Sequence, residues 1–248
     1  VGDLDPEAFF ALVAKYFGDI PPRSRPGAVP TAEPPQQGPR SVEVYFDAEP
    51  QAALAYHKPT LPHRDDYVFD VIDALLSDGR SSRLARELVD RRRVALSVST
   101  AAGIPGARYP NLFTVFVTPA QGVSPGKALD AVREVLADLA AHPPSAEELA
   151  KVRTRLEADR VRALVSDAGL AQRLAYFQAV AGDWRYIERH PDVLATVTPE
   201  EVSRVAARYF TPANETAAIL TPGGKKSGPP HRASRKPSPP PCSSPSTS

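Results

Sequence analysis

The spacing of apolar side chains predicts helices over much of the chain. In residues 6–17 the apolar positions recur every three or four residues, with Asp5 placed to cap the helix and Pro6 in its first turn. Later stretches show the same spacing, and Ser145 and Thr198 precede two of them as capping residues. The further helices predicted in this way cover residues 64–78, 82–91, 124–142, 145–166, 167–184 and 198–210.

Shorter stretches alternate apolar and polar positions with a period of two, which predicts strands. Residues 41–58 contain two such runs with a turn from Asp47 to Pro50 between them. Apolar runs rich in β-branched or aromatic residues follow at 94–103, 110–120 and 215–220. Strands in pairs, followed by helices in runs, favour an α+β fold in which helices pack on one face of an antiparallel sheet.

Composition divides the chain into four parts. Residues 1–20 hold a helix and the end of a strand, which is too little for a domain, so we expect them to complete a preceding α+β domain. Residues 21–41 are rich in Pro and Gly and are predicted to form a linker. Residues 42–221 hold the other elements, and residues 222–248 lack apolar periodicity and are predicted to be disordered. The chain contains no methionine, so we expect a part of a longer protein.

The charge balance excludes several classes of function. The 248 residues include 30 Lys and Arg against 29 Asp and Glu, so no overall field attracts nucleic acid or an anionic membrane.

No apolar run approaches the roughly 20 residues that span a bilayer, so we expect a soluble chain. Its compartment is unknown, and a bacterial, chloroplast or mitochondrial location fits the composition. The single cysteine, Cys242, excludes an internal disulfide framework.

Residues 77–98, SDGRSSRLARELVDRRRVALSV, concentrate six arginines between apolar stretches. Gly79 is placed to end one helix and Ser81 or Ser82 to cap the next, so these residues need no catalytic role. Most of the arginines lie on the polar face of that second helix. Three consecutive cations complement the dipole at its end and are the candidate substrate contacts: Arg91, Arg92 and Arg93.

The motifs of the common hydrolases are absent from the sequence. A nucleophile elbow needs a glycine two residues on either side of the serine, but Arg83 follows Ser81 at that position. No two of the five histidines have the spacing of HExxH or of the inverted HxxEH. The sequence therefore predicts no catalytic residue and no metal ligand in this chain.

Several segments, in this order, closely resemble the C-terminal domain of the pitrilysin/insulinase family of zinc metallopeptidases, the inverzincins. The most specific is GRSSRL, followed by REL and a strand that ends in SV. The second is VGDLDPE with YFGDIP near the start, and SAEELAKVRTRLEADRV and AYFQAVAGDW add to it. The resemblance covers residues 1–221.

The resemblance implies an architecture and a different role for each half of the protein. A complete family member has two similar halves, each of two related α+β domains, that close around an unfolded peptide. The N-terminal half binds zinc through HxxEH and a downstream glutamate, whereas the C-terminal half binds no metal and supplies chamber wall and substrate contacts. The chain would then need an HxxEH-bearing half, in cis or as a partner subunit in trans, and zinc is expected there.

One departure from the family pattern concerns substrate contact. Many members hold the substrate backbone near the zinc with an Arg-x6-Tyr pair between the helix and the strand. Alignment of RELVDRRRVALSV on that passage puts Val89 at the Arg position and Leu96 at the Tyr position. Either the arginines at 91–93 take over this role, or this copy does not face a reacting substrate.

Three functions stay open on the sequence. The chain is the non-catalytic portion of a zinc metalloendopeptidase that cleaves unfolded peptides, and is not expected to be catalytic alone. Alternatively, it is a degenerate scaffold or core subunit of a processing-peptidase-like complex. The third is a nucleic-acid-binding module, although we expect neither nucleic acid nor a membrane as partner. That module would use the basic tail residues Lys225, Lys226, Arg232, Arg235 and Lys236.

Overall fold

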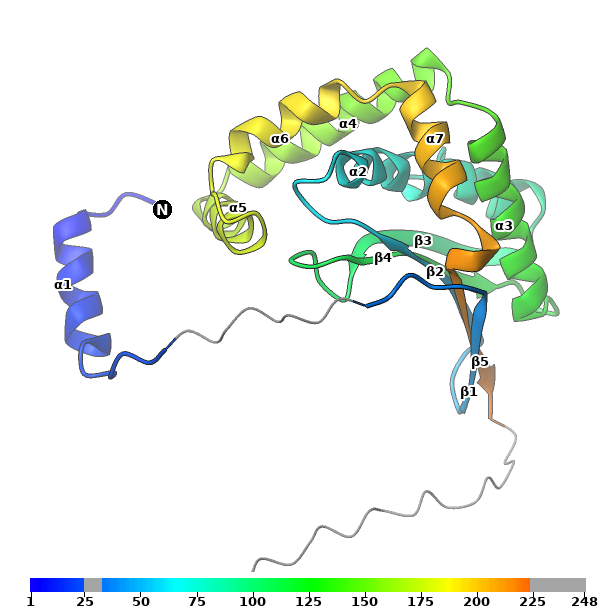
Figure 1. Ribbon diagram of the computed structural model, residues 1–248, viewed down its shortest axis with the longest axis horizontal. Coiled ribbons are helices and arrows are strands. Elements are labelled where there is room, and N and C mark those ends of the chain that lie inside the picture. The colour runs from blue at the N-terminus through cyan, green and yellow to red at the C-terminus, as the bar shows by residue number, and fades with distance from the viewer. Residues whose placement is uncertain (25–32, 224–248) are drawn as a thin grey trace, which may run out of the picture.

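The computed structural model describes residues 1–24 and 33–223, so the predicted tail lies almost wholly outside the described residues, as does the middle of the predicted linker. The chain forms a mixed α and β fold (Figure 1). The elements are α1 (Pro6–Phe17), β1 (Arg40–Phe46), β2 (Gln51–Lys58), α2 (Arg64–Ser77), the π-helix η1 (Ala85–Arg91), β3 (Ala95–Ile104), β4 (Asn111–Pro119), α3 (Pro125–Ala141), α4 (Ala146–Leu164), α5 (Asp167–Val180), α6 (Tyr186–Ala195), α7 (Pro199–Tyr209), the short 3-10 helix η2 (Pro212–Asn214) and β5 (Glu215–Pro222).

The five strands form one sheet in the order β1-β5-β2-β4-β3. Pairs β2–β4, β2–β5 and β3–β4 are antiparallel, as predicted. The pair β1–β5 is parallel, because β5 inserts between the two strands that the sequence suggested as neighbours. The turn at Asp47 to Pro50 therefore carries the chain from an edge strand across β5 rather than closing a hairpin.

One face of this sheet is covered and the other is open. Helices α2, α3 and α7 lie on one side (Figure 1), where Leu54 of β2, Val115 of β4 and Phe69 of α2 are fully buried. On the other side the strand register places side chains of four strands in one row. That row reads Val42, Ala218, Ala53 and Phe116, and its end members are 49% and 42% exposed. Apolar surface thus remains on the open face.

The helix starts follow the sequence signals. The Ser145 hydroxyl accepts from the backbone N–H of Glu148 at 3.1 Å, and the Glu148 carboxylate accepts from the N–H of Ser145 at 3.0 Å. Thr198 and Glu201 form the same reciprocal box at the start of α7. Asp5 caps α1 by accepting from the N–H of Glu7 at 2.9 Å. These capping predictions are confirmed.

Helix α1 is amphipathic but has no buried residue. Phe10, Tyr16 and Phe17 are between 61% and 69% exposed. A helix with such side chains normally buries them against another element. Among the described residues, none covers the apolar side of α1.

Gly79 follows α2 with φ of 84°, a conformation in which an L side chain is strained. A Cβ there would also lie 2.6 Å from Nη1 of Arg155, whose guanidinium donates to the carbonyl of Asp78. We expect Gly79→Ala to lower the free energy of unfolding by about 1–2 kcal/mol, measured by urea denaturation. Gly106→Ala is the matched control, because a Cβ there meets nothing within 4 Å and φ is not positive. Equal effects of the two substitutions would contradict this account.

Candidate functional site

The arginine-rich stretch forms a wide helical turn at the edge of the core. Residues Ala85–Arg91 are a π-helix rather than the predicted α-helix, and the N–H of Arg92 donates to the carbonyl of Glu87, five residues back, at 2.9 Å. Leu84 and Leu88 point into the core and are fully buried. The prediction of a serine cap is wrong: the helix has no side-chain cap, and the hydroxyl of Ser82 is buried without a partner among the described residues.

The last three arginines differ in how they are held. The guanidinium of Arg91 lies 2.7 Å from the Glu87 carboxylate, four residues back, an ion pair that the spacing predicts. Arg92 forms an ion pair with Glu134 of α3. Arg93 is exposed, has a left-handed backbone with φ of 52°, and forms no ion pair within the described part of the chain. Arg93 is therefore the freest of the three for an external contact.

In many family members two side chains clamp the substrate backbone, and this chain has Val89 and Leu96 at those positions. The two residues lie in different environments. Val89 is half-buried and packs against the hydrophobic core. Leu96, at the start of β3, is 65% exposed. Neither side chain can donate or accept a hydrogen bond, so these two positions cannot clamp a peptide backbone through their side chains.

The histidines of the described residues do not converge on a metal site. His63 caps α2 by accepting from the N–H of Asp65 at 3.1 Å, His142 lies 2.9 Å from a carboxylate oxygen of Asp138, and His190 lies 3.0 Å from one of Asp70. In residues 1–24 and 33–223, no three His, Cys, Asp or Glu side chains lie together as a metal site requires. This part of the chain therefore does not fit a zinc ion.

Two further sequence predictions concern a membrane span and the basic tail. Over the same described ranges, no helix combines the length and the apolar character needed to cross a bilayer. The basic tail residues between 225 and 236 lie outside the described residues.

Comparison with known proteins agrees with this geometry. The family model described as the peptidase M16 inactive domain matches residues 1–156. The zinc protease PqqE of Helicobacter pylori is 27% identical over 231 residues, which cover 90% of this chain and 50% of that protein. An uncharacterized zinc protease of Streptomyces coelicolor is 27% identical over 216 residues, covering 83% of this chain and 45% of that protein.

Solved structures show the same fold. A crystal structure of a protease from Helicobacter pylori gives a TM-score of 0.79 at 26% identity, over 90% of this chain and 54% of that chain. The peptidase M16 inactive domain from Pseudomonas fluorescens gives a TM-score of 0.75 at 18% identity, over 90% of this chain and 52% of that chain. The second likeness, at its low identity, shows the fold alone.

The chain spans about half the length of the curated relatives that it matches. The family match covers more than half of the chain, and it concerns the half that does not carry the catalytic motif. The pitrilysin/insulinase resemblance is thereby confirmed. This chain belongs to the peptidase M16 family and is homologous to its inactive, C-terminal domain, the non-catalytic half of M16 proteins.

Proposed function

We propose that this chain forms one wall of a peptide-binding chamber that is completed by an HxxEH-bearing half, in cis or as a separate subunit. Zinc and the hydrolysis of unfolded peptides belong to that other half. One observation carries the proposal. Nearly the whole chain matches about half of each zinc protease relative, and the sequence of this chain contains no zinc-binding motif.

Residues 1–20 support this reading of the chain's place in a longer assembly. They form a capped helix whose apolar side chains, including Phe10 and Phe17, are exposed. We infer that these residues complete the domain that precedes the linker at 21–41, and that residues 42–221 are the C-terminal domain. In such an arrangement, the preceding domain would bury the apolar side of α1.

The open face of the sheet also supports a partner. Val42, Val44 and Phe46 of the edge strand are 49%, 49% and 65% exposed, and Phe116 of β4 lies in the same row as Val42. Monomeric proteins seldom leave contiguous apolar surface of this kind uncovered. The half that carries zinc is the partner that this family relationship suggests.

Substrate contacts on this half are proposed for the arginines at the end of η1 and directly after it, Arg91, Arg92 and Arg93. Glu87 and Glu134 hold Arg91 and Arg92, so Arg93 is the proposed contact with substrate backbone carbonyls. An arginine there would act by its charge and its N–H donors, without the tyrosine of the family pair.

Reconstitution tests the proposed function. We expect the 248-residue chain to cleave an extended, unfolded peptide only when mixed with an HxxEH-bearing half of a relative, and we expect a chelator to abolish cleavage and zinc to restore it. Hydrolysis is followed by separating the fragments chromatographically. The control is a partner in which the first histidine of the HxxEH motif is replaced by alanine.

The proposed substrate contact is tested in the same reconstituted pair. Arg93→Ala in this chain should raise the KM for the peptide more than Arg91→Ala does.

The alternative is a scaffold subunit that assembles but supports no cleavage. Val89 and Leu96 favour it, because they replace the Arg and Tyr side chains that hold a peptide backbone in many members of the family. A stable complex of the two halves that cleaves no unfolded peptide, with or without zinc, would establish the scaffold and refute the peptidase proposal.

A further inference from the structure

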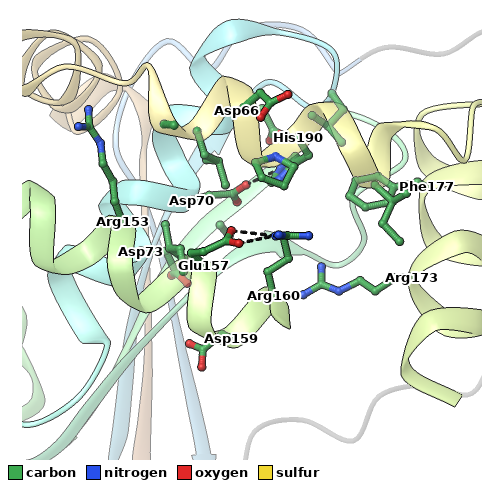
Figure 2. A pocket seen from close by; sticks show the side chains of 18 of the residues that line it. Asp66, Asp70, Asp73, Arg153, Glu157, Asp159, Arg160, Arg173, Phe177 and His190 are labelled. Atoms are coloured by element: carbon green, nitrogen blue, oxygen red, sulfur yellow. Dashed lines mark hydrogen bonds and ion pairs between the residues drawn. The ribbon is translucent and has the colours of Figure 1, made fainter. Parts of the chain in front are cut away.

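A cavity of about 730 Å³ lies between α2, α4, α5 and α6 (Figure 2). Its volume is in the range of sites that bind small molecules. Part of the wall is apolar and comes from α4, α5 and α6, with Leu156, Leu164, Phe177 and Ile187 among its side chains. The cavity lies away from the arginines at 91–93, none of which lines it.

Helix α2 supplies three aspartates to one side of the cavity. Asp66, Asp70 and Asp73 are four and three residues apart, so they share one face of the helix. Within the described part of the chain, only Asp66 is paired with a lysine or arginine, namely the buried Lys58. Asp70 meets His190 at 3.0 Å, and Oδ1 of Asp73 is buried without a hydrogen-bond partner among the described residues. Two carboxylates thus face the cavity without a strong cation.

Within the described residues, no lysine or arginine of the cavity forms an ion pair with Asp70 or Asp73, although Arg173 also lines it. Arg160 is held by Glu157, whose carboxylate oxygen lies 2.8 Å from its Nε, and the guanidinium of Arg153 donates to the carbonyl of Val197 at 2.6 Å. Six carboxylates and four lysines or arginines line the cavity, so its net charge is negative when His190 is neutral.

The surroundings of Asp73 favour a bound cation. Burial raises the pKa of the Asp73 carboxyl above its ordinary value, and the neighbouring Asp70 carboxylate adds to the rise. A buried carboxylate without a partner is unfavourable, and a positive charge beside it would offset the loss of hydration. A metal ion fits poorly, because in the described ranges no three potential ligands come together.

We propose that this cavity binds an alkylammonium or guanidinium group on an aliphatic stem, with the cationic head at Asp70 and Asp73 and the stem against the apolar wall of Leu156 and Leu164. Charge-assisted hydrogen bonds from the head would pair with the carboxylates of Asp70 and Asp73. Such a group comes either from a lysine or arginine side chain of a peptide or from a free polyamine. The binding requires only this chain, so its failure would leave the proposed pairing with a zinc-bearing half untouched.

Isothermal titration of the full 248-residue chain with three probes tests the proposal. The probes are a capped tripeptide with a central arginine, the same tripeptide with citrulline, and 1,5-diaminopentane. Citrulline keeps the shape of arginine and removes its charge. We expect saturable binding of the arginine peptide, the diamine or both, and none of the citrulline peptide. Binding of the arginine peptide alone identifies a peptide as the source, and binding of the diamine alone identifies a free amine.

Two isosteric variants locate the site. Asp73→Asn and Asp70→Asn should each weaken binding of the charged probe at least about tenfold, because each removes one carboxylate partner of the cation. Asp130→Asn on α3, whose side chain is 69% exposed outside the cavity, is the matched control and should bind as the parent does.

The fold of each variant is checked by its thermal midpoint. Asp73→Asn should not lower this midpoint, because it removes a buried negative charge whose Oδ1 has no hydrogen-bond partner among the described residues. The proposal is overturned if neither charged probe binds saturably, if the citrulline peptide binds as well as the arginine peptide, or if the two folded variants bind like the parent.

Discussion

Replacing Lys58 with methionine is expected to lower the free energy of unfolding by about 3–5 kcal/mol at pH 7. The Lys58 side chain is only 2% exposed, forms an ion pair with the Asp66 carboxylate and lies over the ring of Phe69. Methionine retains the length of the apolar stem but leaves the Asp66 carboxylate buried without its cation. Urea denaturation, with the midpoint and slope both fitted, measures the loss.

The pH dependence of this variant provides an independent check. Burial already raises the pKa of Asp66 above 3.8, its ordinary value, and loss of the Lys58 ammonium should raise it further. The folded state then binds more protons than the unfolded state, so stability falls as the pH rises through the interval between the two pKa values. The double variant Lys58→Met/Asp66→Asn should recover most of the loss at pH 7. Equal stability of the single and double variants would refute the ion-pair explanation.

Phe69→Ala should destabilise the domain by about 3–5 kcal/mol. Phe69 is fully buried, and its ring centroid lies 5.4 Å from that of Phe113, 5.3 Å from Tyr209 and 6.0 Å from Phe210. Alanine would leave a cavity at the point where α2, β4 and α7 meet. Phe116→Ala is the control on the opposite face of β4, where the ring is 42% exposed, and thermal denaturation should show a much smaller loss. Comparable losses would mean that the open face is also packed in solution.

Local chemistry made part of the structure predictable from the sequence. A capping box needs only residues three apart, so Ser145 and Thr198 marked the starts of α4 and α7. Gly79 marked the end of α2 because a left-handed residue there suits glycine. The family resemblance supplied the rest of the architecture, which periodicity alone did not give.

Other features depend on residues that are far apart in the sequence. Helix α6 was missed because Pro191 lies inside it, and proline normally predicts a break. The sequence of η1 suits an α-helix equally well, and what distinguishes the π-helix is the backbone hydrogen bond from the N–H of Arg92 to the carbonyl of Glu87, five residues back. The cavity beside α2 could not be predicted, because Asp70 and His190 come together only when α6 packs over α2.

The insertion of β5 between β1 and β2 has a consequence for biosynthesis. β5 is the last strand that the structure describes, yet it is hydrogen-bonded to both of the earliest strands of the sheet. While the ribosome is still making residues 51–214, one edge of β2 has no partner, and β1 has no strand to join. The sheet is therefore completed only after residues 215–222 emerge, and nascent or truncated chains present an unpaired strand edge to chaperones and to one another.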